Sequence, residues 1–147
     1  MRGEGSRRML RVKGFLGVSA IEWPGRLSSV VWVGGCNLRC PYCQNPQLLD
    51  PEALPDLPVE DILSKIAKRK GFVDAVVVTG GEPTIQPGLP DFLREVKRLG
   101  LPCGLETNGT RPEVLGRLIE EGLLDFVALD IKTAPERYAE ATGRDCW

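Results

Sequence analysis

Short apolar segments rich in β-branched residues alternate with amphipathic segments along most of this 147-residue chain. Residues 75–79 read AVVVT, a run typical of a buried strand. Residues 59–67 instead carry apolar side chains at the spacing of one helix face. The same patterns recur, with a helix predicted over 89–96 and strands over 101–106 and 123–129. Alternating strands and helices are typical of right-handed βαβ units, so we predict an α/β fold with a parallel sheet.

The N-terminal part of the chain predicts a hairpin. Residues 10–18 and 27–33 are rich in valine and glycine, and Trp23-Pro24-Gly25 predicts a turn between them. The second strand leads into a cysteine-rich loop, and a proline-rich surface loop follows over residues 44–58. We expect about four βα units after the hairpin, in one domain that covers residues 1–147.

Two later helices are predicted to start at capping boxes, in which a threonine side chain caps the first turn and a glutamate reaches back to it. The two sequences are Thr110-Arg111-Pro112-Glu113 and Thr133-Ala134-Pro135-Glu136. Glycines are expected to end the helices. Gly100 would end the helix over residues 89–96, and Gly122 would end the helix that starts at the first capping box.

Histidine is absent from the sequence, which excludes Ser-His-Asp and Cys-His nucleophile systems and histidine-ligated zinc. Lysine plus arginine number 19 against 20 acidic residues, so the net charge of −1 gives no electrostatic reason to expect nucleic acid or an anionic membrane as a partner. No apolar run is long enough to span a bilayer, and the N-terminus does not read as a signal peptide. We therefore expect a cytoplasmic protein that acts away from membranes.

Cys36, Cys40 and Cys43 lie within eight residues of one another, whereas Cys103 and Cys146 stand apart. An odd number of cysteines argues against a disulfide framework and for a reducing compartment. The three clustered thiols have three interpretations: inert buried side chains, part of a zinc site, or ligands of an iron–sulfur cluster. Three thiolates on a four-iron cubane would leave one iron open for a small molecule, so the spacing favours a catalytic cluster.

Polar motifs follow the carboxyl ends of the strands predicted for the parallel sheet. Because the carboxyl ends of parallel strands meet at one edge of the sheet, these motifs and the cysteine loop are expected to form a single site. Glycines allow a ligand to approach the backbone, and acidic and basic side chains together suit a zwitterionic ligand. The motifs are Gly80-Gly81-Glu82-Pro83, Glu106-Thr107-Asn108-Gly109 and Asp130-Ile131-Lys132.

With these residues, the sequence resembles the radical S-adenosylmethionine (SAM) superfamily. The Cys36-x3-Cys40-x2-Cys43 spacing with Tyr42 is similar to the cluster loop of that superfamily, and Gly80-Gly81-Glu82-Pro83 is similar to its second motif. Residues 12–143 further resemble glycyl-radical-enzyme activating proteins, above all those of anaerobic ribonucleoside-triphosphate reductase. Gln44 and Glu106 stand where pyruvate formate-lyase activases tend to have histidine and aspartate, which argues against that subgroup.

The resemblance implies a partial (β/α) barrel and an oxidoreductase that uses a [4Fe–4S] cluster and SAM. Cys36, Cys40 and Cys43 would ligate the cluster. Reductive cleavage of SAM would yield a 5′-deoxyadenosyl radical, which would take a hydrogen atom from a glycine of anaerobic ribonucleotide reductase. The residues implied to bind SAM, with a monovalent cation beside it, are Tyr42, Gln44, Gly80, Gly81, Glu82, Pro83, Glu106, Thr107, Asn108, Asp130, Ile131 and Lys132.

The resemblance also implies a flavodoxin- or ferredoxin-type electron donor. Longer activases continue with further strands beyond the four units found here, so we expect either a truncated radical SAM domain or a sheet face completed by the partner. Two alternatives stay open. One is a cluster- or zinc-binding module without turnover, and the other is a radical SAM enzyme that acts on a small molecule, for example a deazapurine-forming one.

Overall fold

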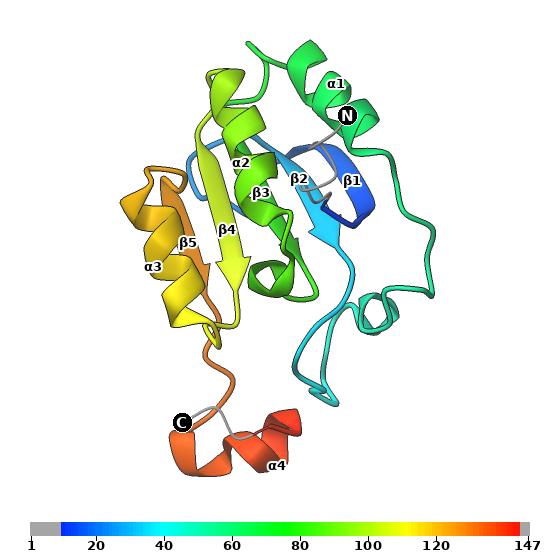
Figure 1. Ribbon diagram of the computed structural model, residues 1–147, viewed down its shortest axis with the longest axis vertical. Coiled ribbons are helices and arrows are strands. Elements are labelled where there is room, and N and C mark those ends of the chain that lie inside the picture. The colour runs from blue at the N-terminus through cyan, green and yellow to red at the C-terminus, as the bar shows by residue number, and fades with distance from the viewer. Residues whose placement is uncertain (1–9, 145–147) are drawn as a thin grey trace, which may run out of the picture.

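The computed structural model describes residues 10–144 and contains one five-stranded sheet with the strand order β1-β2-β3-β4-β5 (Figure 1). The hairpin partners β1 and β2 are antiparallel, and β2, β3, β4 and β5 run parallel to one another. This confirms the predicted α/β class, the N-terminal hairpin and the parallel sheet. The strands are β1 (Val12–Ser19), β2 (Ser28–Val33), β3 (Ala75–Gly80), β4 (Cys103–Thr107) and β5 (Phe126–Leu129).

Three helices pack on one face of the sheet and bury the main hydrophobic core (Figure 1). They are α1 (Val59–Lys68), α2 (Leu89–Arg98) and α3 (Pro112–Glu120). Alternate side chains of the strands, such as Val76 and Val78, meet Ile66 of α1 and Leu93 of α2 in this core. The helices therefore form because each buries one apolar stripe against the same sheet face.

The opposite face of the sheet carries a smaller apolar cluster under the β1–β2 connection. Trp23 packs there against Ala75 and Val77, and its ring stacks on Phe126 with centroids 4.9 Å apart. The predicted turn at Trp23-Pro24-Gly25 thus also supplies the side chain that covers the first residues of β3 and β5 on this face.

Short helices lie in the connections and after the last strand. They are 3-10 turns at Pro46–Leu48, Pro83–Ile85 and Pro135–Arg137, and the helix α4 (Tyr138–Thr142). Both predicted capping boxes are wrong. Helix α3 starts after Arg111 and the last 3-10 turn starts after Ala134, and neither start has a side-chain cap. Thr110 donates and accepts hydrogen bonds elsewhere, with Asn108 and Asn37.

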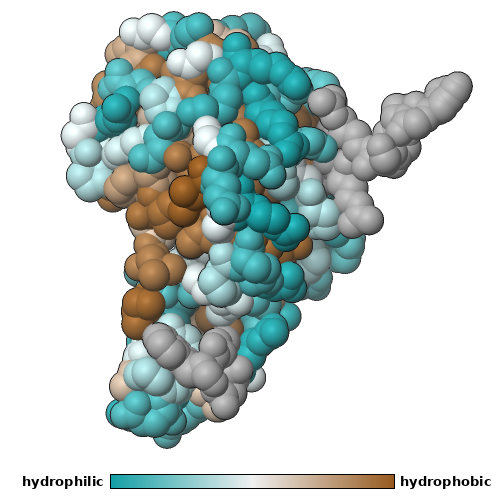
Figure 2. Space-filling model, turned by 60° about the vertical axis from the view of Figure 1, so that its left-hand side comes forward, coloured by the Kyte–Doolittle hydropathy of each residue, from teal (hydrophilic) through white to brown (hydrophobic). Residues whose placement is uncertain are grey.

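Strand β5 has no partner on its outer side within residues 10–144. Leu129, the last residue of β5, and Ile131, which follows the strand, are 53% and 56% exposed. Figure 2 shows hydrophobic surface on this side of the molecule, running toward the lobe that contains α4. No helix within the described residues is both long enough and apolar enough to cross a membrane.

The proline-rich loop is tied to β1 by a charged contact. Lys13 is buried, and its ammonium group lies 2.6 Å from a carboxylate oxygen of Asp56 and donates a hydrogen bond to the carbonyl of Leu54. Arg11 lies on the other side of the same carboxylate, at 3.1 Å. These contacts fix the segment that connects the cysteine loop to α1.

We predict that Asp56→Asn destabilises the protein at pH 7 and that the difference from wild type narrows as the pH falls below about 4. The hydrogen bonds from Lys13 and Arg11 hold the pKa of Asp56 below its ordinary value. Stability from such a carboxylate is present above its unfolded-state pKa of about 3.9 and is lost as the pH falls through the lower folded-state pKa. Urea unfolding from pH 7 down to about pH 3 measures this. An equal deficit at every pH would contradict it.

Candidate functional site

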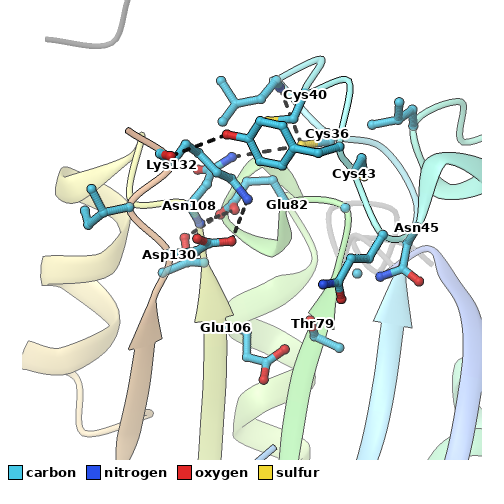
Figure 3. Close-up of a pocket in the computed structure, with 18 residues that line it drawn as sticks. Cys36, Cys40, Cys43, Asn45, Thr79, Glu82, Glu106, Asn108, Asp130 and Lys132 are labelled. Atoms are coloured by element: carbon cyan, nitrogen blue, oxygen red, sulfur yellow. Dashed lines mark hydrogen bonds and ion pairs between the residues drawn. The ribbon is translucent and has the colours of Figure 1, made fainter. Parts of the chain in front are cut away.

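The carboxyl ends of β2, β3, β4 and β5 surround one pocket of about 450 Å³ (Figure 3). The cysteine loop forms one wall, and the segments that follow the other three strands form the rest. Every residue implied to bind the cluster or SAM lines this pocket except Pro83, which is buried at the start of a 3-10 turn, and Gly109 of the third motif does not line it either. Sequence reasoning missed four lining residues, namely Leu38, Asn45, Leu49 and Thr79. Of these four, only Thr79 carries a signal in the sequence. It lies two residues after Val77 on β3, so the two side chains share one face of the sheet.

The cysteine loop is held from two directions. The N–H of Cys43 donates to the carbonyl of Cys40 at 3.1 Å, which makes a tight turn around Tyr42. The guanidinium of Arg39 donates to the carbonyl of Cys36 at 2.7 Å. From outside the loop, the carbonyl of Thr142 in α4 accepts from the N–H of Arg39 at 2.7 Å. The C-terminal helix thus positions the cysteines, although it lies about a hundred residues away in the sequence.

The three thiols are free and face the pocket, with Cys40 9% exposed and the other two half-buried. Burial raises the pKa of Cys36, and the nearby Glu82 carboxylate adds to that effect. Burial also raises the pKa of Cys40, against the opposing charge of Lys132. A thiolate here needs a cationic partner, and iron in a cluster would provide one.

The three free thiols are of the type that ligates an iron–sulfur cluster. Within residues 10–144, no three Cys, Asp or Glu side chains converge on one point as ligands of a single metal ion would. A cubane gives each thiolate its own iron, so its ligands need not converge in that way. Three free thiols on one short loop beside a pocket fit the ligand set of a [4Fe–4S] cluster.

Glu82 is almost completely buried, and its carboxylate joins the ends of β3 and β4. One oxygen accepts a hydrogen bond from the Thr107 hydroxyl at 2.6 Å and from the Thr84 N–H at 3.1 Å, and it also accepts from the Thr84 hydroxyl. The other oxygen accepts from the N–H of Asn108 at 2.7 Å. Because each carboxylate oxygen has about two acceptor positions, only this second oxygen has capacity left for a ligand.

The glycines before Glu82 lie against the strand that leads into the cysteine loop. A Cβ atom on Gly81 would stand 2.0 Å from the carbonyl oxygen of Gly35, which immediately precedes Cys36. The N–H of Glu82 donates to the same carbonyl at 2.8 Å. The glycine pair is therefore required for the second motif to contact the cysteine loop.

Gly81→Ala is accordingly predicted to lower the free energy of unfolding by about 3 kcal/mol, because the new methyl group meets backbone that has no room to shift. Gly116→Ala is the matched control, since a Cβ in this helical position of α3 meets nothing within 4 Å. That change is expected to stabilise the protein by about 0.5–1 kcal/mol. Urea unfolding of both variants tests the pair, and equal effects of the two substitutions would contradict the steric argument.

Asp130 and Lys132 follow β5 and form an ion pair with 2.5 Å between Nζ and the carboxylate oxygen. Burial by itself lowers the pKa of Lys132. The hydrogen bond to Asp130 and the charge of that carboxylate raise it by more, so the pKa of this lysine is raised overall. The segment is fixed by two tyrosines. The N–H of Lys132 donates to the Tyr138 hydroxyl at 2.9 Å, and the Tyr42 hydroxyl donates to the carbonyl of Lys132 at 3.5 Å. The pocket therefore presents a charged ammonium group beside the cysteine loop.

Glu106 lies deeper along the sheet, beside Thr79 and below the cysteine loop (Figure 3). Burial raises the pKa of its carboxyl group, and a hydrogen bond with Thr79 partly offsets that rise. This carboxyl group has far fewer partners than that of Glu82 and can accept from a ligand hydroxyl or hold a cation.

Comparison with known proteins agrees with the fold and the site. Residues 30–147 match the radical SAM superfamily, and the chain belongs to this superfamily. Membership implies a [4Fe–4S] cluster and SAM as cofactors, which the residues around the pocket fit.

The chain is similar to several curated proteins of this kind. It is 39% identical to a protein of Methanocaldococcus jannaschii named as a glycyl-radical enzyme activating enzyme, over 88% of this chain and 53% of the relative. It is 31% identical to the pyruvate formate-lyase-activating enzyme of Clostridium pasteurianum, over 84% of this chain and 53% of the relative. It is 40% identical to the 7-carboxy-7-deazaguanine synthase of Hyperthermus butylicus, over 60% of this chain and 37% of the relative. The chain thus spans about half the length of the activating enzymes it matches.

Solved structures support the fold. SuiB of Streptococcus suis, bound to its precursor peptide SuiA, matches with a TM-score of 0.60 at 21% identity, over 79% of this chain and 27% of that one. QueE of Escherichia coli matches with a TM-score of 0.53 at 21% identity, over 72% of this chain and 54% of that one. These likenesses show a shared fold, the partial (β/α) barrel predicted from the sequence.

Proposed function

We propose that residues 1–147 form the cluster- and SAM-binding domain of a glycyl-radical-enzyme activating protein. The observation that carries the proposal is the single pocket in which three free cysteines meet charged groups from the ends of three parallel strands. In addition, the match to the M. jannaschii activating enzyme extends over most of the chain, whereas the match to the deazaguanine synthase covers 60% of it. This favours an activase over an enzyme that acts on a small molecule.

Cys36, Cys40 and Cys43 would hold the cluster, with one iron left without a protein ligand. When bound, the reduced cluster and SAM together supply one-electron radical chemistry. The surrounding residues bind and orient the nucleotide and exclude water. We assign the carboxylate of SAM to Lys132, and its ammonium group to the free acceptor position of Glu82 and the backbone of Gly80 and Gly81.

The remaining pocket residues would contact the nucleoside part of SAM. We assign the adenine to the backbone around Tyr42 and to Gln44, and the ribose to Glu106, Thr107 and Asp130. A monovalent cation beside these carboxylates would offset their charge. Asn108 and Ile131 complete the lining. Pro83 acts indirectly in this assignment, because it shapes the turn after Glu82 and does not line the pocket.

We propose anaerobic ribonucleotide reductase as the partner, with a glycine of that enzyme as the hydrogen donor and a flavodoxin- or ferredoxin-type protein as the electron source. The proposal rests on the sequence resemblance and on Gln44 and Glu106, which differ from the residues expected in pyruvate formate-lyase activases. We also propose a reducing, cytoplasmic setting, because cluster ligands must remain free thiolates.

Electron paramagnetic resonance tests this proposal. The reconstituted chain is incubated anaerobically with SAM, dithionite and either purified anaerobic ribonucleotide reductase or pyruvate formate-lyase. A glycyl radical doublet is expected with the reductase and is not expected with the lyase. A doublet only with the lyase would overturn the choice of partner. SAM cleavage without a doublet on either protein would favour the alternative of a small-molecule substrate.

A further inference from the structure

Asn108 makes a contact that binding of SAM does not require. Its side-chain amide nitrogen lies 3.9 Å from the Sγ atom of Cys36, within reach of a hydrogen bond to sulfur, and 3.0 Å from the carbonyl oxygen of the Asn37 side chain. Asn108 as a whole is 9% exposed, so little water competes with either contact. Figure 3 shows Asn108 beside Glu82 and below the cysteine loop.

The orientation of this amide is fixed by its neighbours. The backbone N–H of Thr110, which can only donate, lies 3.1 Å from the Asn108 side-chain oxygen, and the Thr110 hydroxyl donates to the same oxygen at 2.8 Å. That hydroxyl in turn accepts from the Asn37 amide at 2.7 Å. Because the oxygen of Asn108 must face Thr110, its NH2 group must face Asn37 and Cys36.

The backbone of Asn108 is fixed as well, since its N–H donates to the buried Glu82 carboxylate at 2.7 Å. Cys36 receives a second donor, the N–H of Leu38, at 3.4 Å from its Sγ atom. The sulfur of Cys36 thus has one donor from its own loop and one from the end of β4. The side-chain donor is the one that a substitution can remove.

We propose that Asn108 is a positioning residue that sets the reduction potential of the cluster through the Cys36 thiolate. This inference rests on the proposed function, because it requires that Cys36 ligates a cluster. Reduction adds one negative charge to the cluster, and a donor to a ligating sulfur stabilises the form with more negative charge. Asn108 therefore makes the cluster easier to reduce.

Anaerobic redox titration of the full chain, reconstituted with iron and sulfide and measured without SAM, tests the proposal. Asn108→Ala removes the donor, and the ratio of reduced to oxidised cluster at a given potential is expected to fall about fivefold, which is about 40 mV at about 59 mV per tenfold change. Asn108→Asp keeps the size of the side chain and the acceptor for Thr110 but adds a negative charge, so its potential is expected to fall further.

Asn45→Ala is the matched control, because Asn45 lines the same pocket and, within residues 10–144, hydrogen-bonds through its backbone carbonyl and not through its side chain. Its potential is expected to equal that of wild type. Equal potentials for wild type and Asn108→Ala, or for wild type and Asn108→Asp, would overturn the inference while leaving the proposed function intact. Failure of the wild-type chain to assemble any cluster would overturn both. If Asn108→Ala does not assemble a cluster, the reduction potential of Asn108→Asp is compared with that of wild type instead.

Discussion

Replacing Cys40 by serine is expected to abolish cluster assembly, with at least tenfold less iron and sulfide bound than in wild type after anaerobic reconstitution. Two thiolates from one short loop cannot hold a cubane that three would otherwise ligate. Burial already makes the Cys40 thiol harder to ionise, and a serine hydroxyl is a far weaker acid still. Iron and sulfide analysis, together with the visible absorption of the cluster, measures the loss.

Cys103→Ala provides the control for the cysteine prediction. Cys103 is fully buried in the core of the sheet and does not line the pocket, and burial raises the pKa of its thiol to about 12. This variant is expected to bind as much iron as wild type and to lose only about 1 kcal/mol of stability from the small cavity. Undiminished iron in Cys40→Ser, or its loss in Cys103→Ala, would mean that the ligands have been assigned wrongly.

Glu82→Ala is expected to lower the free energy of unfolding of the cluster-free protein by about 3–5 kcal/mol. The substitution leaves the N–H groups of Thr84 and Asn108 and the hydroxyl of Thr107 buried without their acceptor. Each such loss costs the desolvation of a polar group, and the ends of β3 and β4 lose the link between them. Urea unfolding in the absence of iron isolates this structural effect from any effect on SAM.

Glu106→Gln serves as the comparison for Glu82. Burial raises the pKa of Glu106, which means that folding disfavours its charged form. The neutral amide is therefore expected to leave stability at pH 7 unchanged or slightly higher. If Glu82→Ala and Glu106→Gln had the same small effect on unfolding, the buried carboxylate could not be the link between the strand ends.

Much of the fold follows from local sequence pattern. The AVVVT run of β3 and the spacing of Ile62 and Ile66 in α1 each indicate their element without reference to the rest of the chain. Because the strands are parallel, the motifs after them had to meet at one edge. Most residues of these motifs do line the pocket, together with Tyr42 and Gln44, which the family resemblance implied.

The parts that could not be predicted depend on contacts between distant segments. Thr110 looks like a helix cap in the sequence, but it instead bonds to Asn108 and Asn37, and the latter lies 73 residues away in the sequence. Likewise, the carbonyl of Thr142 in α4 supports the cysteine loop through Arg39, and no local pattern indicates that contact. Glycine and glutamate in the second motif indicate a turn and a charge, whereas the burial of Glu82 is visible only once β3 and β4 lie side by side.

We propose that these three cysteines and the pocket beside them support reductive cleavage of SAM. The most direct test is to reconstitute the chain anaerobically with iron and sulfide, add dithionite and SAM, and quantify 5′-deoxyadenosine, with Cys40→Ser in parallel. We predict a brown protein that forms 5′-deoxyadenosine, and no product from the serine variant. A colourless, zinc-loaded protein that forms no product would contradict the account.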